Sequence, residues 1–66
     1  MTASVTGREI LLEFTQQGAY MRVAAVDAET GVEAVIVGPA NAARHDLEAL
    51  AVRKLERLLA QRQQQQ

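Results

Sequence analysis

The residues of this sequence that come closest to candidates for acid–base catalysis are His45 and two spaced glutamates. His45 is the only histidine, the side-chain type that most readily exchanges protons near neutral pH. Its neighbour Asp46 points about 100° away around a helix, so the two are not expected to form a dyad. Glu9 and Glu13 share one side of a predicted strand but lie roughly 13 Å apart, too far for a paired-carboxylate site. We therefore expect no enzyme activity from this chain alone.

Cofactor and metal chemistry have equally little support in the residue types. There is no cysteine, and a single histidine rules out a site built from several imidazoles. The four glycines are spaced as turns and form neither a dinucleotide-binding nor a P-loop pattern. The sequence predicts neither a cofactor nor a metal ion.

A cluster of basic residues near the C-terminus supports a different hypothesis, nucleic-acid binding. Arg53, Lys54 and Arg57 lie close together, and Arg8 and Arg22 belong to predicted strands. The formal net charge is −1, however, from seven basic and eight acidic residues, and the only aromatic residues are one Phe and one Tyr. Strong nucleic-acid binders need clustered positive charge or stacking platforms, and basic residues late in a helix also suit its dipole. We keep nucleic-acid binding as the alternative function, to be tested by a salt-dependent gel shift.

The order of a strand, Gly and a helix ending in "AVRKLERLL" also resembles the C-terminal half of double-stranded-RNA-binding domains. Those domains contact phosphates with lysines at the start of that helix. Here the corresponding residues are "NAARHD", and the first helix of that fold is missing. A three-stranded sheet with one helix also resembles small DNA-binding domains that read the major groove, but Arg8 and Arg22 alone are a thin basis for that.

In three segments the side chains divide between two faces in the alternating pattern of β-strands: residues 8–16, 19–27 and 32–38. Gln17-Gly18 is the expected two-residue turn of the first hairpin, which places Glu13 opposite Arg22. Residues 28–31 form the second loop, with Asp27 capping it and Gly31 in the left-handed conformation. Both hairpins place the same set on one face: Ile10, Leu12, Phe14, Met21, Val23, Ala25, Ala34 and Ile36.

An amphipathic helix follows Gly38-Pro39, because apolar residues recur from Ala43 in steps of three and four. Asn41 is the expected N-cap, with a helix start shifted by two or three residues as the alternative. The predicted fold is therefore α+β, a three-stranded antiparallel meander with one C-terminal helix packed on one face (β-β-β-α). We expect a flexible lead-in at 1–7, one domain at 8–61 and a disordered Gln-rich tail at 62–66.

The opposite face of the sheet is also apolar, although one helix covers only one face. A chain of this size without disulfide or metal often gains stability by associating, and an apolar patch rimmed by charges is typical of an interface. We expect a homodimer or higher oligomer, packed sheet to sheet or strand to strand, with onward binding to another, unidentified protein as a further possibility. The alternative is that small apolar residues are simply tolerated on an exposed sheet, and a slipped register would redistribute them. The candidate interface residues are Leu11, Tyr20, Ala24, Val26, Val35 and Val37.

Four stretches carry a resemblance to a small uncharacterised family of alphaproteobacteria, a domain of unknown function: "REILLEF", "VAAVDAETG", "IVGP" and "LAVRKLERLL". The resemblance spans about residues 8–60. It implies a bacterial cytoplasmic protein and brings no activity, cofactor or catalytic residue. The sequence itself shows neither a signal peptide nor a membrane-spanning run, which also favours the cytoplasm.

Overall fold

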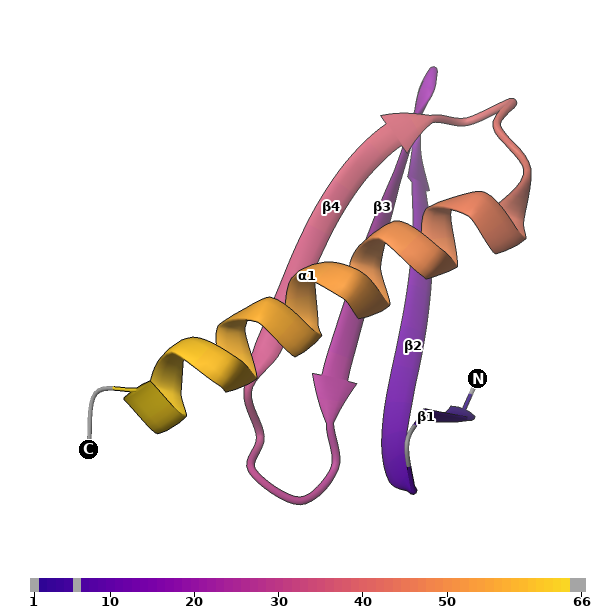
Figure 1. Cartoon of the computed structure of the whole chain (residues 1–66). Coiled ribbons are helices and arrows are strands. Elements are labelled where there is room, and N and C mark those ends of the chain that lie inside the picture. Colours follow the sequence, from indigo (N-terminus) through magenta and orange to yellow (C-terminus); the bar gives the residue numbers. More distant parts are fainter. Residues whose placement is uncertain (1, 6, 65–66) are drawn as a thin grey trace.

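The computed structural model describes residues 2–5 and 7–64, with side chains for residues 7–62. Its sheet contains β1 (Thr2–Val5), β2 (Arg8–Gln17), β3 (Tyr20–Asp27) and β4 (Glu33–Pro39), and α1 (Arg44–Gln64) follows. The strands are antiparallel and lie in sequence order, and α1 runs obliquely across one face of the sheet (Figure 1). The predicted meander with one packed helix is confirmed, with an additional N-terminal strand.

That additional strand is a departure from the predicted lead-in and comes from residues 2–5. β1 pairs antiparallel with the start of β2, with Thr2 opposite Leu11. Gly7, in the tight connection, has a φ of 76°, a conformation that glycine adopts at no steric cost. The other end differs too, because α1 continues through Gln64, whereas residues from 62 were predicted to be disordered. Residues 1, 6, 65 and 66 lie outside the described part.

The first hairpin is shifted by two residues from its predicted register. Phe14 lies opposite Val23 and Glu13 opposite Ala24, so the predicted Glu13–Arg22 pair is wrong. The turn is Gly18-Ala19 rather than Gln17-Gly18, and Gly18 has a φ of 60°. Glycine at the first turn position is the requirement of a type II′ hairpin, whose twist matches that of its strands. Because the shift is by two, every side chain keeps its predicted face.

The second hairpin has the predicted register and loop. Val23 lies opposite Ile36 and Ala25 opposite Ala34. Gly31 has a φ of 77° and donates its N–H to the Asp27 carbonyl oxygen at 2.8 Å. The loop therefore closes as the Asp27 and Gly31 residue types predicted.

The hydrophobic core lies between α1 and the face of the sheet that the alternation predicted. The helix rests mainly on β3 and β4 (Figure 1). At its start, the Arg44 guanidinium lies 4.7 Å from the centre of the Phe14 ring, a cation–π distance that ties this helix end to β2. A Cβ on Gly38 would lie only 2.5 Å from Cδ2 of Leu47, so glycine lets the helix approach β4 closely. The buried apolar side chains of this core are Ile10, Leu12, Met21, Val23, Ala25, Ala34, Leu47, Ala51 and Leu55.

The N-cap of α1 is Ala43, two residues after the predicted Asn41. The Ala43 carbonyl oxygen accepts the first hydrogen bonds of the helix, from the N–H groups of Asp46 and Leu47 at 3.0 and 3.2 Å. Alanine has no side-chain oxygen to accept from the free N–H groups of the first turn. No helix in the part of the chain that the structure describes is long and apolar enough to cross a membrane.

Ala43→Ser should therefore stabilise the protein, by about 0.5–2 kcal/mol, because serine supplies the missing cap. The free energy of unfolding from urea titration followed by circular dichroism measures the gain. Asn41→Ala is the matched control and should change that free energy by less than about 0.5 kcal/mol, since Asn41 is exposed and outside the helix. A loss of stability in Asn41→Ala, with no gain in Ala43→Ser, would mean that Asn41 is the N-cap of α1.

Candidate interaction interface

The face of the sheet opposite α1 carries all six candidate interface residues. Leu11, Tyr20 and Val37 are 44%, 61% and 62% exposed, and Val26 and Val35 are half-buried. The pairings place Leu11 beside Val26 and Ala24 beside Val35, so the set forms a continuous patch across three strands. Among the described residues, no helix lies on this face. We call this patch the open face.

Charged residues surround and cross the open face. Glu9, Glu13 and Glu33 are exposed there, and Arg22 is the one cation from the same strands on this face. The Arg22 guanidinium lies 4.0 Å from a Glu33 carboxylate oxygen, and this pair replaces the Glu13–Arg22 contact that the sequence predicted. The open face thus consists of apolar side chains that are rimmed by glutamates and crossed by the Arg22–Glu33 pair, a mixture of apolar and charged groups that protein–protein interfaces also show.

The free edge of β4 is partly closed. Hydrogen bonds from Asp27 N–H to the Val32 oxygen and from Ala40 N–H to the Ala19 oxygen fix which β4 residues bond to β3. By alternation, Glu33, Val35 and Val37 direct their backbone groups outward. Nζ of Lys54 donates to the Val35 carbonyl oxygen at 2.8 Å, in the way that lysine side chains protect edge strands. This contact disfavours association through the β4 edge and leaves the open face available.

The five basic residues of the nucleic-acid alternative do not share one surface. Arg8 points to the helix side of the sheet and pairs with Asp27, and Arg22 lies on the open face. Lys54 is bonded to the β4 edge, while Arg53 and Arg57 are exposed on α1. The fold therefore does not gather them into one positively charged surface.

Asp27 is a buried charged group that the sequence predicted only as a turn cap. Its Oδ2 accepts from the Thr30 hydroxyl at 2.6 Å, from the Thr30 N–H at 3.1 Å and from the Arg8 guanidinium at 2.9 Å. Oδ1 is buried and accepts from no described residue. The Thr30 hydroxyl is the main reason that the pKa of Asp27 falls below its ordinary value of about 3.8, against the opposing effect of burial, with help from the Thr30 N–H and Arg8.

The Arg8–Asp27 contact could have been found from the sequence. Arg8 and Asp27 share the helix side of the sheet, and either register of the first hairpin places them within reach of each other. Arg8, a candidate for nucleic-acid contact, is instead paired within the chain. The cluster holds the start of β2 to the loop between β3 and β4.

The lowered pKa of Asp27 predicts a pH dependence of stability. A carboxyl group whose pKa is lower in the folded state stabilises the fold fully above its ordinary pKa of about 3.8, and that contribution is lost as the pH falls through the folded value. The free energy of unfolding should therefore decline below about pH 4 more steeply in the wild type than in Asp27→Asn. Urea titrations from neutral pH into the acid range test this. Parallel curves for the two proteins would contradict it.

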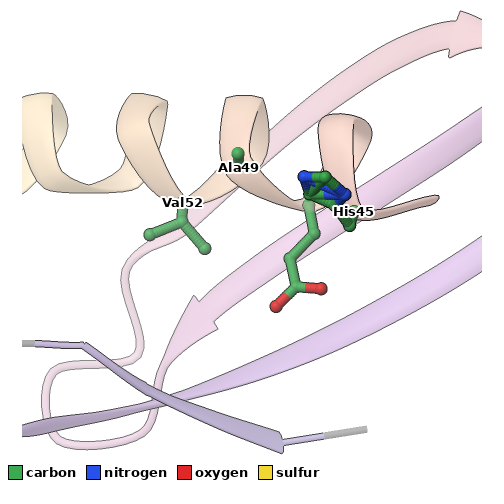
Figure 2. A pocket seen from close by; sticks show the side chains of 4 residues that line it. His45, Ala49 and Val52 are labelled. Carbon is green, nitrogen blue, oxygen red and sulfur yellow. The ribbon is translucent and has the colours of Figure 1, made fainter. Parts of the chain in front are cut away.

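A shallow hollow of about 290 Å³ lies along one side of α1 and is lined by His45, Glu48, Ala49 and Val52. Figure 2 shows that its labelled residues come from successive turns of the helix. His45 Nε2 lies 3.5 Å from Asp46 Oδ1, closer than the offset around the helix predicted, but both side chains are exposed. Nothing shields a reacting group from water there. In the described part of the chain, no three His, Cys, Asp or Glu residues are placed to hold a metal ion.

These features define a class of small α+β protein in which a single helix covers one face of an antiparallel sheet and leaves an apolar face open. Residues 7–63 match the family described as Domain of unknown function (DUF6898), and the chain belongs to that family. No curated protein and no solved structure matches the chain. The resemblance to an uncharacterised family is confirmed, whereas its alphaproteobacterial origin stays a prediction.

Proposed function

We propose that this protein is a small non-enzymatic interaction module that self-associates through the open face. The observation that carries the proposal is the exposure of Leu11, Tyr20 and Val37 on a face that α1 does not cover. Within the segment that matches the family, α1 is the only helix, and it packs on the other face. A second copy supplies a matching apolar surface and removes this patch from water.

The geometry favours sheet-to-sheet packing over strand pairing through the β4 edge. Lys54 is bonded to the outward carbonyl of Val35, and Pro39 at the end of β4 has no N–H to donate to another strand. Packing through the open face does not require the contact between Lys54 and the Val35 carbonyl oxygen to break. Two antiparallel sheets packed face to face bury alternate side chains of each strand, and here those side chains include the six candidate residues.

Sedimentation equilibrium of the purified protein, from dilute to concentrated solution, tests the proposal. We expect the mass of two or more chains, decreasing toward one chain on dilution as mass action requires. A mass of one chain throughout would refute self-association.

A further inference from the structure

The Arg22–Glu33 ion pair lies across the middle of the open face. Arg22 is opposite Val37 and Glu33 is opposite Val26, and the Ala24–Val35 pair lies between these two rows. The rows are four residues apart along β4, roughly 13 Å. Charged groups that start so far apart come within 4.0 Å only if both side chains lie along the sheet, over Ala24 and Val35. Ala24 is accordingly only 3% exposed, although it lies on the face without a helix.

This pair is weakly held within one chain. Its separation of 4.0 Å is long for a charge-assisted hydrogen bond, and the Arg22 and Glu33 side chains are 36% and 48% exposed. Exposed ion pairs of this kind contribute little to stability because water and salt screen them. The two side chains can therefore separate at small cost when another surface approaches.

The positions of Arg22 and Glu33 are self-complementary under twofold symmetry. Consider a twofold axis that lies between two sheets and crosses the strands over the Ala24–Val35 row. It places the row of Arg22 in one copy over the row of Glu33 in the second copy, one strand apart. Each guanidinium then meets a carboxylate of the other copy, and the two charge pairs flank the apolar centre.

We propose that Arg22 and Glu33 exchange partners on association, so that the ion pair within each chain is replaced by two ion pairs between copies. This inference rests on the proposed self-association and adds the residues that set its geometry. Uncovering Ala24 and Val35 brings the apolar centres into contact, while the exchanged pairs fix the orientation of the copies.

Charge reversal in mixed samples tests the exchange. Arg22→Glu and Glu33→Arg should each weaken the homodimer about tenfold or more, because each places like charges together across the interface. An equal mixture of the two variants should form a heterodimer well above its statistical share, since each chain carries the charge that the other lacks. Native mass spectrometry resolves the three dimers, because the variants differ in mass.

The control mixture is Glu56→Arg with Arg57→Glu, which reverses the same charge types on the exposed side of α1 and should give only the statistical share. The double variant Arg22→Glu/Glu33→Arg should dimerise like the wild type, because opposite charges again meet between the copies. It keeps the exchange testable if one of the single variants does not fold. If the wild type dimerises but the Arg22 and Glu33 variants mix statistically, the exchange is refuted and self-association stands. A monomeric wild type would refute both.

Discussion

Leu55→Ala is expected to remove most of the folding free energy of this protein. Leu55 is fully buried in α1, within the cluster that joins the helix to β3 and β4. Removing a buried leucine side chain costs about 2–5 kcal/mol, from lost transfer free energy and from the cavity that remains. A single core of this size supplies only about 3–5 kcal/mol in total. Little or no cooperative unfolding transition should therefore remain.

Urea titration followed by circular dichroism at 222 nm, a wavelength typical of helix, measures the loss of Leu55. Glu56→Ala is the matched control, because it truncates the next residue of the same helix, which is exposed, and should change stability by less than about 0.5 kcal/mol. An unchanged urea midpoint in Leu55→Ala would mean that α1 does not carry the core of the fold.

Which side chains share a face was predictable because alternation depends only on whether a strand position is odd or even. The register was not, since both Gln17-Gly18 and Gly18-Ala19 make acceptable turns and differ by two residues. Such a shift leaves the core and the open face unchanged but replaces every cross-strand neighbour. The six candidate interface residues therefore share one face, as the alternation predicted, while the Glu13–Arg22 pair does not exist.

The remaining differences come from contacts that depend on a third element. Ala43 occupies the N-cap position of α1 because the turn after β4 ends two residues later than the Asn41 side chain suggested. Lys54 looked like part of a basic cluster, but the packing of α1 places its Nζ on the β4 edge. β1 pairs with β2 from residues whose small polar types gave no strand pattern. Each of these depends on tertiary geometry that no local pattern encodes.

Val35→Asp is expected to abolish self-association while leaving the domain folded. Val35 lies in the apolar centre of the open face, with its side chain pointing away from α1 and its backbone bonded to Lys54. In a single chain the new carboxylate stands at a half-buried position beside the partly exposed Arg22–Glu33 pair and can still reach water, so the main cost is the lower strand preference of aspartate, up to about 1 kcal/mol. In the dimer the same charge is buried without a partner, which costs several kcal/mol. Several kcal/mol is enough to dissociate an interface of two small sheets.

Sedimentation equilibrium of Val35→Asp should thus give the mass of one chain under conditions where the wild type gives two, with a circular dichroism spectrum that is still folded. Val35→Thr keeps the branched shape and adds no charge, so it should remain associated. Ala49→Asp adds the same charge to the exposed side of α1 and should have no effect on the mass. If the Val35→Asp protein keeps the wild-type mass, the interface does not lie on the open face. Because the exchange of Arg22 and Glu33 takes place over Val35, that result would refute the exchange as well.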